Sequence, residues 1–352
     1  MDLESRADLM GIYLREETKI RGVILLFLIA ASLKAQSPPT CQAGLDQVKS
    51  GDYQGAQVAL WSCLDSGSAN ATDAFYLTLT YRELKNYDSG LSRVNAALKR
   101  IPDNADLLYL AAFLQYRKGE SKDSMLLLSK AYKLTPEDWR IHQLFALNYI
   151  TFKMNEAVEA KLKKAIALNP TNAELEYQLG RLYFTLNWYE KSIEAMQRAL
   201  AIVPDYPEVY DSLGLTYEAM QDEKKAAESF AKAVELDRKH GIKDPWPLIN
   251  YAKCLLFYDQ SPEACLPLLA QALEIDPHSP EANYQMGRVQ RVLHRDAEAE
   301  KYFEKTIEVD PSFSYAYYQL GTLLQMRGET ARASLLLDRF KALTEKNKKS
   351  NP

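Results

Sequence analysis

Prolines recur along this chain at a fixed interval of 34 residues. The interval separates Pro102, Pro136, Pro170 and Pro204, and it also separates Pro277 from Pro311. Each proline follows a run of helix-forming residues, such as Ala-Leu-Ala-Ile-Val before Pro204. Proline cannot continue a helix, because it lacks a backbone N–H and clashes with the preceding turn. The chain is therefore predicted to be a row of equivalent helical units.

The residues between the prolines predict two helices in each unit. Residues 173–206 align with residues 280–313 when each unit starts three residues after a proline. In the first of these segments the apolar and small residues form two sets, Leu179, Gly180 and Tyr183, then Ser192, Met196 and Ala199. Spacings of one, three and four residues place each set on one helix face.

Small residues recur at equivalent places, where we expect the two helices of a unit to touch. They are Gly180, Gly214, Gly287 and Gly321 in the first helix and Ala199, Ala233 and Ala272 in the second. Antiparallel helices approach closely when the facing side chains are small, so glycine and alanine are predicted to face each other. A large side chain at Gly287 would overpack this contact and cost about 1–3 kcal/mol.

This pattern resembles the tetratricopeptide-repeat family over most of the chain. Matching units begin at Ala71, Ala105, Trp139, Ala173, Pro207, Trp246, Pro280 and Ser314. A degenerate earlier unit from about residue 37 retains Gly44, the turn Gly51-Asp52-Tyr53 and Ala56, which gives about nine units. The resemblance implies an all-α fold, a right-handed superhelical solenoid of about nine antiparallel helix pairs over residues 36–347, with a polar tail at 348–352.

The 34-residue interval is broken between Pro204 and Pro277. Five extra residues lie around Lys239–Lys243, and Arg238 stands where a unit-ending proline is expected. Since Pro245 follows later, the sequence predicts a longer turn there, with a local kink or a bulged loop.

The N-terminal segment resembles a secretory signal peptide. Lys19 and Arg21 precede an apolar run over residues 23–31, which is about half the length that a bilayer requires. We predict cleavage after Ala35 and export to the periplasm or the secreted space. The alternatives are a membrane anchor over residues 22–33, a buried amphipathic cap in a cytoplasmic protein, and translation from Met10 instead of Met1.

Four cysteines allow several pairings, and one pairing fits the hairpin. In an antiparallel helix pair the start of the first helix lies beside the end of the second, which places Cys41 near Cys63. In an exported chain this pair is predicted to form a disulfide that stabilises the end unit by about 3 kcal/mol. Cys254 and Cys265 are expected to be reduced or buried.

The sequence contains no recognisable catalytic, metal or cofactor motif. A formal net charge of −4 gives no general attraction for nucleic acid. Gly-rich phosphate loops and the HExxH, CxxC and GxSxG motifs are absent, and the histidines are scattered: His142, His240, His278 and His294. We therefore expect no enzyme activity, no cofactor and no metal site.

The concave face, formed by the first helix of each unit, is the predicted binding surface. An aromatic series and three arginines fall there, namely Phe75, Tyr109, Tyr177, Tyr284 and Tyr318 with Arg181, Arg288 and Arg291. Tyrosine supplies rigid area with a polar tip and arginine a planar fork, which together suit an acidic or C-terminal peptide. The alternative is that the aromatic residues pack between units. The concave face is predicted to be apolar in the N-terminal half of the chain and more basic in the C-terminal half. The apolar residues expected there are Leu79, Phe113, Leu147 and Leu215.

These features predict a non-catalytic scaffold that binds a peptide or a partner protein on its concave face. An accessory subunit that brings substrates to an enzyme is one alternative, because a separate subunit could carry the chemistry. A second alternative is an envelope protein that self-associates through its terminal faces, suggested by the leucines at 335–337 in the last unit. Membrane contact is expected through an uncleaved N-terminal segment alone.

Overall fold

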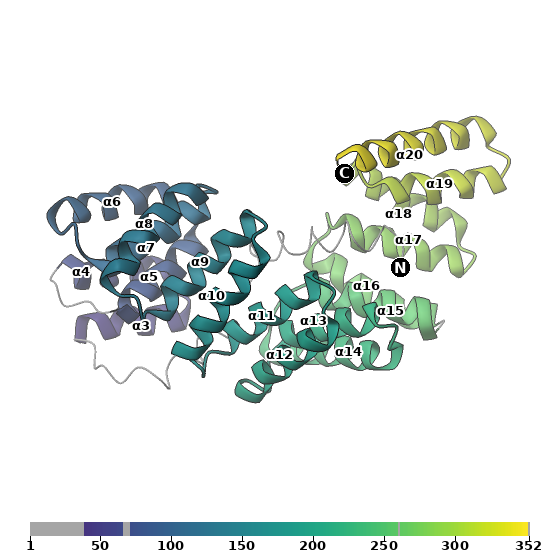
Figure 1. The fold of residues 1–352 in the computed structure, drawn as a ribbon. Helices are drawn as coiled ribbons and strands as arrows, with labels where there is room; N and C mark the ends of the chain where they lie inside the picture. Colours follow the sequence, from purple (N-terminus) through teal and green to yellow (C-terminus); the bar gives the residue numbers. More distant parts are fainter. Residues whose placement is uncertain (1–38, 66–70, 260, 351–352) are drawn as a thin grey trace. The chain divides into compact units, whose positions relative to one another are not determined.

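The computed structural model describes residues 39–65, 71–259 and 261–350 of the chain. Within these ranges the regular structure is entirely helical, with 18 α-helices and one π-helix (Figure 1). The predicted signal segment and its cleavage site lie outside the described residues. In the described ranges, no helix combines the length and the apolar character needed to cross a bilayer.

The chain divides into two compact units, residues 1–204 and residues 205–352. The described part of the first unit is a series of consecutive helix pairs. These are α3 (Pro39–Ser50) and α4 (Tyr53–Asp65), α5 (Ala71–Leu84) and α6 (Tyr87–Arg100), α7 (Ala105–Arg117) and α8 (Ser121–Leu134), α9 (Trp139–Thr151) and α10 (Asn155–Leu168), and α11 (Ala173–Thr185) and α12 (Tyr189–Ile202).

The second unit continues the same arrangement. Its helices are α13 (Pro207–Ala219) and α14 (Glu223–His240), α15 (Trp246–Cys254) with the π-helix η1 (Leu255–Asp259) and α16 (Pro262–Ile275), α17 (Pro280–Val292) and α18 (Asp296–Val309), and α19 (Ser314–Met326) and α20 (Thr330–Ser350). Helix α20 continues through residue 350, so the polar tail predicted from residue 348 begins inside the last helix.

A residue with positive φ joins the two helices of most units and repeats with the unit length. These residues are Gly51, Lys85, Gly119, Lys153, Asn187, Gln221, His294 and Gly328, with φ between 53° and 84°. The left-handed conformation reverses the chain between two antiparallel helices. Because Gly51 falls in the same series, the pair α3–α4 shares the register of the later units.

The glycines of the first helices lie against large side chains, which corrects the expected glycine–alanine contact. A Cβ atom at Gly287 would lie 2.6 Å from Cε1 of Phe303, and one at Gly214 would lie 2.5 Å from Phe230. Gly180, Gly321 and Gly44 meet Met196, Leu337 and Leu60 in the same way. Each glycine thus leaves a hollow that a bulky residue of the second helix fills. Ala199, Ala233 and Ala272 are fully buried.

The pair α5–α6 reverses this arrangement. The large side chain here is Tyr81 of the first helix, and a Cβ atom at Gly90 of the second helix would lie 2.6 Å from its ring. The hydroxyl of Tyr81 accepts a hydrogen bond of 2.7 Å from the indole of Trp61. The ring therefore ties the second helix pair to the first one.

The five extra residues lengthen a helix, whereas the sequence predicted a longer turn with a kink or a bulged loop. Helix α14 runs for 18 residues, one turn more than the 14 of α12 or α18. Gly241 ends it with φ 66°, and Ile242 donates a hydrogen bond of 2.8 Å to the carbonyl of Asp237. This is the αL cap that glycine favours at helix ends. The added turn buries Asp237, and burial together with Asp244 and Asp211 raises the pKa of its carboxyl to about 8.

The cysteines of the opening pair are joined in the structure. Cys41 of α3 and Cys63 of α4 form a disulfide, with their Cα atoms 5.6 Å apart and both side chains fully buried. Cys254 and Cys265 are buried and belong to no disulfide among the described residues. The thiol of Cys265 donates to the carbonyl of Ala252 at 3.2 Å, and burial raises its pKa to about 11.

Candidate functional site

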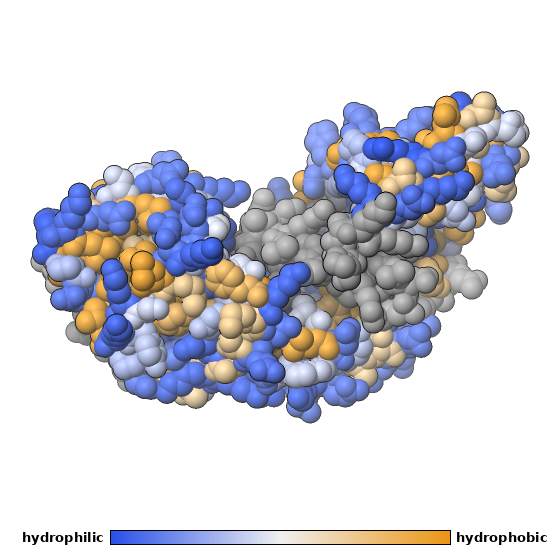
Figure 2. All heavy atoms as spheres, turned by 45° about the horizontal axis from the view of Figure 1, so that its top comes forward, coloured by the Kyte–Doolittle hydropathy of each residue, from blue (hydrophilic) through white to orange (hydrophobic). Residues whose placement is uncertain are grey.

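A groove in the first unit is lined by four consecutive first helices, α5, α7, α9 and α11. Each helix contributes residues three or four positions apart, such as Phe75, Leu79 and Arg82 on α5. Residues at this spacing share one helix face, so every helix presents a single stripe to the groove. Figure 2 shows apolar side chains, in orange, gathered on the surface of the first unit at the left.

Aromatic rings form the floor of the groove. The ring of Phe75 on α5 lies 5.6 Å from the ring of Trp139 on α9, although the two residues belong to units that are not consecutive. Tyr109 on α7 is buried, and burial raises the pKa of its hydroxyl far above the ordinary value. Tyr177 is buried on α11. These rings give the groove an apolar base that needs little rearrangement to accept a side chain.

A buried arginine fixes the starts of α7 and α9 relative to each other. Arg140 is 4% exposed, and its Nη2 lies 2.7 Å from the carboxylate of Asp106. Its Nε donates to Asp138 at 3.0 Å, and the guanidinium lies 4.9 Å from the ring centroid of Tyr109. A buried arginine satisfied by two carboxylates holds both helix ends in one geometry. The network therefore positions Tyr109, and Arg140 itself is not part of the groove lining.

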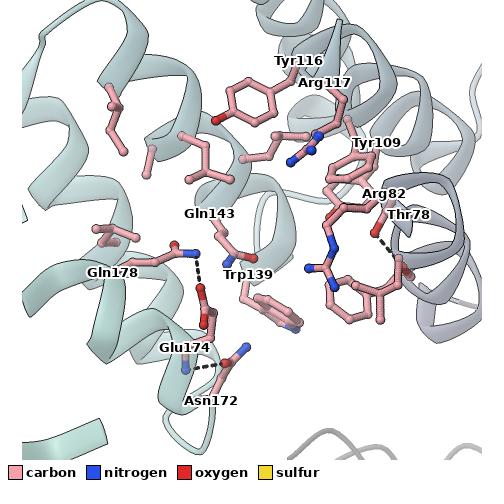
Figure 3. A pocket seen from close by; sticks show the side chains of 18 of the residues that line it. Thr78, Arg82, Tyr109, Tyr116, Arg117, Trp139, Gln143, Asn172, Glu174 and Gln178 are labelled. Atoms are coloured by element: carbon pink, nitrogen blue, oxygen red, sulfur yellow. Dashed lines mark hydrogen bonds between the residues drawn. The ribbon is translucent and has the colours of Figure 1, made fainter. Parts of the chain in front are cut away.

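Side-chain amides supply polar groups along the groove (Figure 3). Gln178 donates from Nε2 to Glu174 at 2.8 Å, and its buried Oε1 has no hydrogen-bond partner among the described residues. The amide of Gln143 on the neighbouring helix lines the same groove. Asn172 caps α11 by accepting from the backbone of Glu174 at 3.1 Å. Amides offer both donors and acceptors, which is what a peptide backbone requires.

Three arginines line the groove, and one of them, Arg82, is ion-paired with Glu83 at 3.0 Å. The lining contains Arg82, Arg117 and Arg181, with Glu174 as the acidic side chain among them. Arg117 donates to the hydroxyl of Tyr87 at 3.3 Å, and the guanidinium of Arg181 lies 5.7 Å from the ring centroid of Tyr177. Aromatic contacts of this kind orient a guanidinium, whose planar fork matches the geometry of a carboxylate.

The size of the groove limits what it can hold. Its volume is about 130 Å³, below the range of about 300–1,000 Å³ typical of small-molecule sites. This is room for one or two apolar side chains. Together with the amides and arginines, the groove suits a segment of polypeptide that inserts a side chain and places its backbone or a carboxylate on the polar groups.

Four of the predicted binding residues meet in this groove. Phe75, Tyr109, Tyr177 and Arg181 line it, with the three aromatic side chains largely buried in its floor. The sequence analysis missed Arg82, Arg117, Gln143 and Gln178, and it predicted an early half that is mainly apolar. Helical spacing could have identified the two arginines as groove residues. Arg82 lies three residues after Leu79, and Arg117 lies four residues after Phe113, so each shares a helix face with a residue predicted to line the groove.

The other four predicted residues lie in the second unit. Tyr284 is buried against Phe303 and Phe313, whereas Tyr318 is exposed and its ring lies 5.3 Å from that of Phe340. Tyr284 shares a hydrophobic cluster with Ala316 and Leu320 of α19 in the next repeat, which is the packing between repeats considered as the alternative for the aromatic series. Arg288 and Arg291 lie on α17.

The histidines and acidic residues form no metal site in the described part of the chain. No three His, Cys, Asp or Glu side chains gather there in an arrangement able to hold a metal ion. His142 is buried, and its Nε2 lies 2.9 Å from the carbonyl of Pro136. Burial lowers the pKa of this imidazole. The contact suits a structural role within α9.

Several segments of the chain match repeat families by sequence. Residues 180–221 match the family described as TPR repeat, and residues 79–138, 207–240 and 302–333 match families described as tetratricopeptide repeat. The chain is 31% identical over 97 residues to the TPR repeat-containing protein MJ1428 of Methanocaldococcus jannaschii. That match covers 28% of this chain and 16% of the archaeal protein.

Solved structures share the fold at low sequence identity. The Cut9–Hcn1 hetero-tetramer of the APC/C contains a chain that matches with a TM-score of 0.67 at 15% identity, over 85% of this chain and 58% of the other. Pseudomonas aeruginosa pilF matches with a TM-score of 0.55 at 18% identity, over 62% of this chain and 96% of pilF. At these identities the likeness concerns the arrangement of helix pairs.

Proposed function

Because the chain is a tetratricopeptide-repeat protein, we propose that it is a non-catalytic scaffold that holds a segment of a partner protein in the groove of its first unit. The fold is typical of protein–protein interaction scaffolds. A stack of helix pairs buries its core between neighbouring pairs and leaves the faces of the first helices for binding. The partner supplies any chemistry in which the assembly takes part.

The observation that carries this proposal is the composition of the groove. An apolar floor built on Phe75 and Trp139 lies beside two amides, Gln143 and Gln178, and three arginines. An extended segment alternates its side chains, so one side chain can enter the floor while the backbone between its neighbours meets the amides. The arginines favour a segment that carries a carboxylate next to its apolar anchor.

Capture of partners by the tagged full-length chain tests the proposal. Gln143→Trp fills the groove, and Arg181→Glu reverses a charge at its edge, so both variants should lose the proteins that the wild type retains. Leu126→Glu is a matched control, because Leu126 is an exposed residue of α8 away from the groove lining. Equal capture by the wild type and both groove variants would show that the partner binds elsewhere.

We also propose that the chain is exported. The apolar run at residues 23–31, which follows Lys19 and Arg21, supports export. The disulfide between Cys41 and Cys63 also supports export, because such bonds persist in oxidising compartments. N-terminal sequencing of the mature protein from its native host should begin at Gln36. A mature N-terminus upstream of Val23 would exclude cleavage.

Self-association is a second candidate, favoured by one observation. Leu335 on the terminal helix α20 is exposed, although Leu336 and Leu337 beside it are partly covered. A terminal apolar side chain can join two copies end to end. Light scattering over a range of concentrations should then show a mass that rises with concentration and returns to the monomer in Leu335→Ser, and a constant monomer mass would exclude it.

A further inference from the structure

Two arginines on α17 have neutral hydrogen-bond partners and no carboxylate partner within the described part of the chain. Arg288 donates from Nη1 to Oε1 of Gln285 at 3.0 Å. Arg291 donates from Nη1 to Oε1 of Gln319 at 2.5 Å and to Oγ1 of Thr322 at 2.9 Å. Neither guanidinium forms an ion pair with a described acidic residue, although the chain carries more acids than bases. Their positive charges are therefore held in place but not neutralised.

The two side chains extend in opposite directions from α17. The guanidinium of Arg288 lies 5.8 Å from the ring centroid of Phe257 in η1 and 5.9 Å from that of Tyr284. Arg291 reaches α19 through Gln319 and Thr322. Because the arginines are three residues apart, their Cβ atoms lie on one helix face about 5–6 Å apart. A segment that crosses α17 would meet both guanidinium groups.

Exposed apolar side chains surround this pair. Phe257 is 65% exposed, Val292 is 52% exposed and Met326 is 77% exposed. Val292 and Met326 are the last residues of α17 and α19, and Nη2 of Arg291 lies 3.7 Å from the sulfur of Met326. A single exposed apolar residue is ordinary, but three on neighbouring first helices, next to two unneutralised arginines, form a patch.

The patch is particular to these helices. The position of Val292 and Met326 is occupied by Arg117, Thr151, Thr185 and Ala219 in the units that begin at 105, 139, 173 and 207. Phe257 is presented by the π-helix, which replaces the last turn of the first helix in its unit. Turns of this type are frequent at functional sites. Packing of the repeats alone therefore does not account for the patch.

We propose that this surface, made of Phe257, Arg288, Arg291, Val292 and Met326, binds a short acidic segment of a partner protein that also carries apolar side chains. Two carboxylates of the segment pair with the two guanidinium groups, and the apolar side chains cover the three exposed residues. The arginines are already oriented by Gln285 and Gln319, so binding orders few side chains. The proposal does not depend on the groove of the first unit, and together the two surfaces allow the protein to hold two segments.

Selection from a display library of short random peptides by the full-length Gln143→Trp chain, in which the groove of the first unit is filled, tests the proposal. The selected peptides should contain at least two Asp or Glu residues next to an apolar residue, and their binding should weaken as salt is added. Arg288→Gln and Arg291→Gln should each raise Kd about tenfold, since each removes a charge-assisted hydrogen bond. Arg288→Lys and Arg291→Lys keep the charge but lose the fork, so an intermediate loss is expected.

Variants of the apolar residues separate binding from folding. Phe257→Ser and Met326→Ser change exposed side chains, so they should weaken peptide binding and leave the melting temperature unchanged. Val58→Ser and Leu126→Ser are matched controls, because both residues are similarly exposed and lie outside the patch. Selection with the Gln143→Trp chain keeps the groove of the first unit from supplying acidic peptides, because that groove is also proposed to take a carboxylate beside an apolar side chain.

Three results would overturn the proposal. The first is a selection without acidic preference. The second is acidic peptides whose binding is unchanged when Arg288→Gln and Arg291→Gln are added together. The third is binding to anionic phospholipid vesicles that the double variant abolishes, with no peptide selected, because the arginines would then recognise a lipid headgroup.

Discussion

Substitution of Gly287 by leucine tests the packing between the two helices of a unit. A Cβ atom at this position would lie 2.6 Å from Cε1 and 2.7 Å from Cδ1 of Phe303. Carbon atoms in favourable contact are about 3.5–4.0 Å apart. Phe303 is fully buried and its ring centroid lies 6.0 Å from that of Tyr284, so it cannot swing into solvent.

Two effects of opposite sign determine how much Gly287→Leu changes the free energy of unfolding. Leucine forms helices better than glycine, which by itself would stabilise α17 by about 0.8 kcal/mol. Overpacking of a well-filled core costs about 1–3 kcal/mol, and the short contacts place Gly287→Leu near the upper end. The net free energy of unfolding should therefore fall by about 2 kcal/mol. For a cooperative unit of this size the melting temperature should fall by about 4–8 °C.

Thermal melts followed by circular dichroism provide the measurement. Gly321→Leu should cost less, because its neighbour Leu337 is partly exposed and can move. Gln325→Leu adds the same side chain at an exposed position of α19 and should leave the melting temperature within error of the wild type. Combination of Gly287→Leu with Phe303→Ala should destabilise less than the sum of the two single changes. Strict additivity, or a higher melting temperature for Gly287→Leu, would refute the packing.

The buried carboxyl of Asp237, with its pKa raised to about 8 by burial and two neighbouring carboxylates, should make the second unit less stable as pH rises. The unfolded carboxyl loses its proton near the ordinary value while the folded one keeps it, so stability falls over about pH 4–8 and then levels off. Thermal melts of Asp237→Asn should lack this slope. Cys41→Ser should destabilise the first unit by about 3 kcal/mol, measured by denaturant unfolding. Gln221→Gly should raise the melting temperature slightly, because φ at Gln221 is 62°.

Each of these predictions has a contrary result. Parallel pH profiles for the wild type and Asp237→Asn would mean that the carboxyl ionises normally in the folded state. A non-reduced digest without a peptide linking Cys41 to Cys63 would exclude the disulfide in the native protein. A lower melting temperature for Gln221→Gly would show that the glutamine side chain stabilises the turn more than its conformation costs.

The repeat period predicted the arrangement of helices because it is set by strong local signals. Proline ends a helix wherever it stands, and small and apolar residues at helical spacing define the packed face. The first helices accordingly begin at residues such as Ala71, Ala173 and Pro280, where the sequence units begin. The partner of each glycine was not predictable in the same way. It depends on how far the second helix slides along the first, which brought Phe303 over Gly287.

The groove could be predicted in part. Equivalent repeat positions placed Tyr109, Tyr177 and Arg181 on one face. The surroundings of Tyr109 depend on Arg140, which belongs to the next repeat and could not be assigned to it from the spacing. The extra residues before Gly241 could extend a helix or a loop with similar local preferences. The π-helix has no distinctive sequence pattern, so the presentation of Phe257 could be seen in the structure alone.

Photo-cross-linking in the native host tests the central claim most directly. A photoreactive amino acid in place of Gln143 lies in the groove of the first unit, and one in place of Leu126 lies on α8 outside it. The structure predicts that residue 143 cross-links to one short, contiguous segment of a partner protein, with an apolar residue beside an acidic one, and that residue 126 does not. Cross-links of equal yield at both positions, or none at residue 143, would contradict a peptide-binding groove.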